Sequence, residues 1–110
     1  MTAMILPFFG QASNTIGFDV TGTSARVQVL PNASSTARWS AKIVNTGAAS
    51  VFINAGDVTV TATIPVNGGA RGSQCIAAGS TEVLTFTGPY LAAISASGTC
   101  TIYITEGYGI

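Results

Sequence analysis

The sequence predicts an all-β fold, a single-domain antiparallel β-sandwich of jelly-roll-like type with seven to eight short strands. Three observations lead to this expectation. Thr, Val and Ile dominate segments in which apolar and polar residues alternate, as in strands with one buried face. Glycine, asparagine and proline interrupt these segments at regular intervals, as turns do. Helical spacing of apolar residues is absent, and the nearest candidate, Ile76 to Ala78, ends at Gly79.

The strands are expected in the following order. The first covers residues 15–20, and the second covers 24–30, with Val27 facing away from Arg26 and Gln28. In the third, over 37–45, Trp39 lies on the apolar face and Lys42 on the polar one. Turn signals then separate further strands at 50–55, 58–64, 81–87, 91–96 and 99–105. Residues 65–73, rich in glycine, form a loop.

The alternation also predicts the buried core, because residues two apart in a strand share a face. We expect one apolar core between two sheets, since 110 residues suffice for a single domain. Its members are Trp39, Ile43, Val51, Ile53, Leu84, Ile94, Ile102 and Ile104.

Residues 1–14 form a separate segment before the sandwich domain, which covers residues 15–110. The segment is apolar without regular alternation, and the adjacent Phe8 and Phe9 face opposite ways if it is extended. It is either an edge segment packed on the domain or an arm that contacts a partner. In the glycine-rich loop, Arg71 is either a contact residue or a solvated charge.

Charge is scarce, and this excludes several function classes. Only 7% of the residues are charged, against about 25% in ordinary domains, and the net charge is zero. The four basic residues are scattered, so no basic stripe exists for nucleic acid. The apolar run from Met4 to Phe9 is too short to cross a membrane and lacks the basic start of a signal peptide. We therefore expect synthesis in a cytoplasm, with Cys75 and Cys100 as free thiols.

The residues for catalysis and metal binding are also missing from the sequence. Without histidine there is neither a Ser-His-Asp arrangement nor the commonest metal ligand. The four carboxylates show no pattern that pairs them, and the glycine-rich loop fits no phosphate-binding motif. We therefore expect no enzyme activity, no catalytic residues, no cofactor and no metal. Tyr90, Tyr103 and Tyr108 are the remaining candidates, either as a binding platform or as ordinary cross-strand packing.

Three stretches resemble known proteins: Ala41 to Ile53, Gly79 to Leu84, and Leu91 to Ile110. Their succession of "IVN-x-G", "VFI", "GSTEVL" and "AAI-x-ASGT-x-T-x-YIT" is similar to small capsid decoration (cement) proteins of tailed bacteriophages. The resemblance implies a jelly-roll-like fold that binds the outer capsid surface and clamps neighbouring major capsid subunits. It also implies synthesis in the bacterial host, a location on the virion, self-association as a homodimer or homotrimer, and no cofactor.

The protein is then expected to have surfaces that contact the capsid protein and other copies of itself. The candidate residues are apolar or aromatic residues near both ends, together with two from the domain itself: Ile5, Leu6, Phe8, Phe9, Arg71, Tyr103, Tyr108 and Ile110. The tyrosines leave an alternative open, a carbohydrate- or receptor-binding module of a phage tail or fibre.

Overall fold

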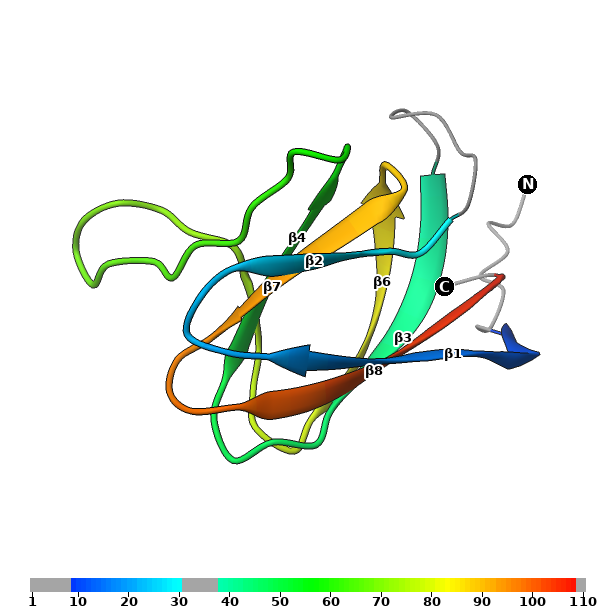
Figure 1. Cartoon of the computed structure of the whole chain (residues 1–110), viewed down its shortest axis with the longest axis horizontal. Coiled ribbons are helices and arrows are strands. Elements are labelled where there is room, and N and C mark those ends of the chain that lie inside the picture. Colours follow the sequence, from blue (N-terminus) through cyan, green and yellow to red (C-terminus); the bar gives the residue numbers. More distant parts are fainter. Residues whose placement is uncertain (1–8, 31–37, 109–110) are drawn as a thin grey trace, which may run out of the picture.

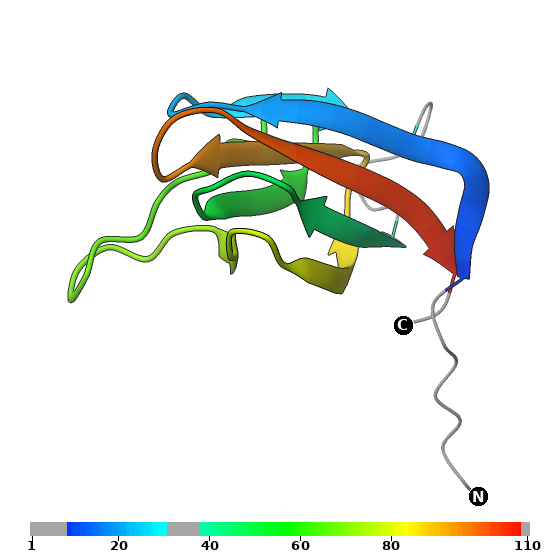
Figure 2. The same cartoon turned by 90° about the horizontal axis from the view of Figure 1, so that it is seen from below.

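The structure, a computed structural model, describes residues 9–30 and 38–108, and within them the chain forms two four-stranded antiparallel sheets packed face to face (Figures 1 and 2). The strands are β1 (Phe9–Val20), β2 (Ala25–Gln28), β3 (Arg38–Asn45), β4 (Val51–Gly56), β5 (Gln74–Ile76), β6 (Thr81–Thr87), β7 (Tyr90–Ser95) and β8 (Cys100–Tyr108).

The first sheet has the order β1-β8-β3-β6 and the second has the order β2-β7-β4-β5. All pairings are antiparallel, and the chain changes sheet at every connection except the one from β4 to β5. This strand order is that of a jelly roll. The predicted fold class is therefore confirmed.

The core lies between the two sheets and follows the predicted alternation. Trp39, Ala41 and Ile43 of β3 are buried, as are Ile102 and Ile104 of β8. Most of the predicted core is confirmed; two of its members are only partly buried, Leu84 and Ile94. Leu84 packs against the edge of the core. Ile94 was placed on the wrong face, because it pairs with Phe52 on the outer side of the second sheet, whereas Leu91 and Ala93 face inward.

Strand β1 begins at Phe9, earlier than the predicted start at residue 15. A bulge between Gly10 and Thr15 shifts its register against β8, and Ser13 takes a positive φ of 60° within it. Asn14 donates to the Oε2 atom of Glu106 over 3.0 Å. A bulge breaks regular alternation, which explains why the sequence pattern did not show this part of the strand. Phe9 to Asn14 thus belong to a sheet edge, and residues 1–8 lie outside the described part of the chain.

The strand predicted at residues 58–64 was wrong, because this segment joins neither sheet. It crosses the outer face of the second sheet over Ala92, whose neighbours in the sheet are Arg26 and Asn54. Both neighbours hold it: Arg26 Nη1 donates to the carbonyl of Val60 (3.1 Å) and Asn54 Nδ2 to that of Thr61 (3.2 Å). The small Ala92 side chain, fully buried, leaves room for the crossing. Tertiary contacts therefore override the local β pattern.

The two cysteines lie in different environments. Cys75 is exposed on the short edge strand β5, whereas Cys100 is buried in the core, with its Sγ atom 3.5 Å from the carbonyl oxygen of Ala49. We predict that a thiol reagent modifies Cys75 quickly in the folded protein and Cys100 only after unfolding. Titration in denaturant without reductant should count two free thiols per chain. A count of zero, or equal rates for both thiols in the folded protein, would contradict this prediction.

Candidate functional site: two contact surfaces and a groove

The contact residues predicted from the sequence lie on different surfaces of the structure. Tyr103 lies on the outer face of the first sheet, and Arg71 belongs to the long β4–β5 connection beside the second sheet. Phe9 and Tyr108 are register partners across β1 and β8, so their backbones lie side by side. The side chains of Phe9 and Tyr108, and all of Ile5, Leu6, Phe8 and Ile110, lie outside the described residues. The predictions for these residues stay untested.

The outer face of the first sheet is polar and carries three charged residues, Asp19, Arg38 and Lys42. Tyr103 is 43% exposed and lies between Gly17 and Val44 in the register. Hydroxyl pairs run along this face: Thr15 with Thr105 at 2.7 Å and Ser40 with Thr85 at 3.1 Å. The hydroxyl groups of each pair are hydrogen-bonded to each other, so burying these pairs against a partner has a small desolvation cost.

A second surface is the β4–β5 arm, residues 57–73, which first crosses the second sheet and then projects beyond the sandwich as the light-green loop of Figures 1 and 2. Among the described residues, four large apolar side chains are exposed, and three of them lie on this arm: Val58 at 55%, Ile64 at 40% and Val66 at 61%. Val58 lies in the turn at the start of the arm, and Ile64 and Val66 lie toward its tip. Exposed large apolar side chains on one element are typical of a protein–protein contact. The sequence analysis missed this surface, because it assigned Val58 and Ile64 to a strand.

Hydrogen bonds order the arm along its length. At the tip, the N–H of Val66 donates to the carbonyl of Ala70, and the N–H of Gly69 donates back to that of Val66, both over 2.9 Å. Further down, the N–H of Ser73 donates to the carbonyl of Thr63 over 2.8 Å. At the base, the N–H of Ala62 donates to Ser24 Oγ over 2.8 Å. An arm held in this way loses less conformational entropy on binding than a free loop.

The arm begins with a turn at Asp57. The backbone N–H of Thr59 donates to Asp57 Oδ1 over 2.8 Å, and the Thr59 hydroxyl donates to the same oxygen over 2.6 Å. The hydroxyl bond and the backbone bond hold the pKa of Asp57 below its usual value. The carboxylate is therefore ionised at neutral pH and acts as the acceptor that sets the turn.

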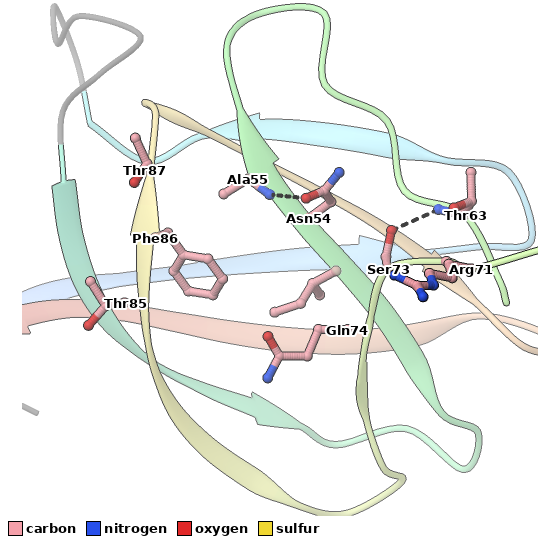
Figure 3. A pocket seen from close by; sticks show the side chains of 11 residues that line it. Asn54, Ala55, Thr63, Arg71, Ser73, Gln74, Thr85, Phe86 and Thr87 are labelled. Carbon is pink, nitrogen blue, oxygen red and sulfur yellow. Dashed lines mark hydrogen bonds between the residues drawn. The ribbon is translucent and has the colours of Figure 1, made fainter.

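A groove opens at the base of the arm, where the two sheets part (Figure 3). It arises because β5 has only three residues, so the second half of β4 faces β6 without a strand beside it. Its volume is about 450 Å³. Its lining comes from β4, from the end of the arm, from β5 and from β6: Ile53, Asn54, Ala55, Thr63, Arg71, Gly72, Ser73, Gln74, Thr85, Phe86 and Thr87.

The tyrosine platform considered from the sequence is not formed by Tyr90 and Tyr103. Tyr90 belongs to β7 of the second sheet and Tyr103 to β8 of the first. Since Tyr103 lies on the outer face of its own sheet, the sandwich core separates the two strands. In the described part of the chain, no three residues among Cys, Asp and Glu gather as a metal site. Within the same ranges, no helix has the length and apolarity to cross a membrane.

Comparisons with protein-family models, with curated proteins and with solved structures find no match for this chain.

Proposed function

We propose that this protein is a bacteriophage capsid decoration protein, which binds the outside of the shell and clamps neighbouring major capsid subunits. The observation that carries the proposal is the β4–β5 arm, an ordered segment with Val58 exposed at its start and Ile64 and Val66 exposed toward its tip. A jelly roll is a fold that viral capsid domains use often, so the strand order agrees with the proposal without being specific for it.

A clamp needs contact surfaces for at least two subunits, and the domain offers them on opposite sides. The base of the arm lies on the outer face of the second sheet, whereas the polar face around Tyr103 is the outer face of the first. One molecule can therefore contact two neighbours across the thickness of its sandwich. Each contact then raises the effective concentration of the other, so individually weak contacts hold the shell together.

Low charge favours the same role. Only eight of the 110 residues are charged, and removing charges from water is a main cost of forming an interface. A domain with few charges also lacks the repulsion that keeps copies apart. We include self-association as a dimer or trimer in the proposal, and light scattering on the purified protein tests it.

Removal of the protein from capsids tests the role directly. We predict that capsids stripped of it, or made without its gene, burst at a lower temperature and in lower salt than complete particles. Adding purified protein back should restore their resistance. Shells that are equally durable with and without the protein, together with purified protein that never co-sediments with them, would refute the decoration role and favour a receptor-binding module.

The arm is tested by a pair of charge insertions in the same co-sedimentation assay. Val66→Asp places a carboxylate at the arm tip, and Ala96→Asp places the same group at an exposed site in the turn between β7 and β8. If Val66 is buried on binding, its variant should lose about tenfold or more in affinity, because the carboxylate must be desolvated without a partner. Ala96→Asp should bind as the unaltered protein does. Equal binding by both variants would exclude the arm tip from the interface.

A further inference from the structure

The groove at the base of the arm carries an inference that does not depend on capsid binding. We propose that it is a saccharide-binding site, in which Arg71 selects sugars that carry a carboxylate. Its volume of about 450 Å³ lies within the range of small-ligand sites, roughly 300–1,000 Å³.

The polar lining suits hydroxyl-rich ligands. It includes amide and hydroxyl side chains from three strands and the arm: Asn54, Thr63, Ser73, Gln74 and Thr87. Thr85 also lines the groove, but its hydroxyl pairs with that of Ser40 on the outer face of the first sheet. Such groups both donate and accept hydrogen bonds, as sugar hydroxyl groups do. A peptide ligand would instead be held chiefly by backbone bonds along a strand edge. The second half of β4 is an unpaired strand edge of this kind, so an extended peptide is the competing ligand. The polar side chains of the lining favour the saccharide.

Some of these side chains are already fixed in place. The Oδ1 atom of Asn54 accepts from the N–H of Ala55 over 3.0 Å, and its Nδ2 atom donates to the carbonyl of Thr61. Ser73 Oγ accepts from the N–H of Thr63 over 3.0 Å. Asn54 therefore joins the arm to β4, and Ser73 joins the two halves of the arm at the wall of the groove. A wall that is ordered before binding reduces the entropic cost of holding a ligand.

Two other lining side chains are available for a ligand. Among the described residues, none forms a hydrogen bond with the side chain of Gln74 or of Arg71, and both residues are exposed. Figure 3 shows the Gln74 amide turned into the space between β4 and β6. Gln74 can hold a sugar hydroxyl by both its oxygen and its nitrogen.

The charge of the groove sets the preferred ligand. Arg71 is the only ionisable residue in the lining, and no acidic side chain lines the groove beside it. A guanidinium group binds a carboxylate with two parallel hydrogen bonds. A uronic acid is therefore expected to bind more tightly than the matching neutral sugar.

The floor suits the apolar face of a sugar ring. Ala55 and the edge of Phe86 supply apolar surface beneath the polar wall, with the buried Ile53 behind them. The Phe86 ring is only 9% exposed and packs on Trp39, with ring centroids 4.7 Å apart. The floor is thus rigid, and C–H groups of a sugar can pack against its exposed edge.

Titration of the isotopically labelled full chain, followed by NMR, tests the inference with two probes. Digalacturonate and α-1,4-galactobiose have the same linkage and differ in their carboxylate groups. Amide signals of Asn54, Ser73, Gln74 and Thr85 should shift with both probes, and digalacturonate should bind about tenfold more tightly. Shifts confined to residues outside the groove, or no shift with either probe at millimolar sugar, would overturn the inference.

Three variants separate the contributions. Gln74→Ala should weaken both probes about tenfold, whereas Arg71→Met should remove only the preference for digalacturonate. Lys42→Met removes the same charge from the outer face of the first sheet and should change neither affinity. The inference would also be overturned if Lys42→Met lowered the affinity for digalacturonate as much as Arg71→Met does. It would likewise be overturned if an extended peptide shifted the amide signals and neither sugar did. The Val66→Asp experiment is unaffected by these outcomes, so failure of the groove and failure of the capsid role are distinguishable.

Discussion

Replacing Trp39 with alanine should lower the free energy of unfolding by about 3–5 kcal/mol, a large part of the stability of a small domain. The indole is 5% exposed, packs against Phe86 and belongs to the core cluster. Its Nε1–H also donates to the carbonyl oxygen of Gly88. Truncation therefore leaves a cavity and a carbonyl without its donor. The melting temperature should fall by about 12 °C or more, which calorimetry measures.

Trp39→Phe separates the two contributions. It keeps an aromatic ring against Phe86 but removes the donor to Gly88, so a smaller loss of about 1–3 kcal/mol is expected. The residue that accepts this bond must be glycine, because Gly88 has a φ of +100° and a Cβ atom there would collide with the backbone of Gly56. If Trp39→Ala melts within about a degree or two of the unaltered protein, the indole is not a core residue and an interface role becomes the better interpretation.

Replacing Asn45 with aspartate should destabilise the fold by at least about 3 kcal/mol at neutral pH, although the two side chains have nearly the same shape. Asn45 is fully buried at the end of β3. Its Nδ2 group faces the carbonyl oxygens of Ala49, Ile76 and Ala77, at 2.9, 3.1 and 3.3 Å. Its Oδ1 atom accepts from the N–H of Gly47 over 2.9 Å. A carboxylate would keep the bond from Gly47 and turn an acceptor toward three carbonyl groups.

Asn67→Asp is the matched control for this substitution. Asn67 is exposed near the tip of the arm, so the same chemical change should alter the free energy of unfolding by no more than about 0.5 kcal/mol. Urea denaturation of both variants gives the comparison. Similar stability for Asn45→Asp and Asn67→Asp would show that the Asn45 amide does not tie the start of β4 to the end of β5.

The sequence by itself determined the fold class and most of the core. Alternation in β3 placed Trp39, Ala41 and Ile43 on one face, and the same period in β8 placed Ile102 and Ile104. These inferences succeed because burial of one face of a strand repeats every second residue, whichever strands lie beside it. The alternation could not place Ile94, because the central strand β7 carries apolar residues on both of its faces.

Little of the candidate site was predictable. Arg71 and Tyr103, both predicted as contact residues, are exposed, and the structure places them on different surfaces. The exposed valines of the arm looked like strand residues, and nothing local distinguishes Val58 from an apolar residue that a sheet will cover. The sequence does not single out Gln74, because its exposure to a ligand depends on where β5 ends and on the space between β4 and β6.

Tertiary structure decided these features because each of them joins parts of the chain that are distant in sequence. Residues 58–64 became the base of an arm rather than a strand because Arg26, Asn54 and Ser24 supply hydrogen bonds that a sheet edge would otherwise have supplied. The groove exists because two strands from different sheets meet where a third one stops. A local pattern indicates which face of a strand is buried. It does not indicate which distant residues will form hydrogen bonds with the backbone of that strand, or where a groove will remain beside it.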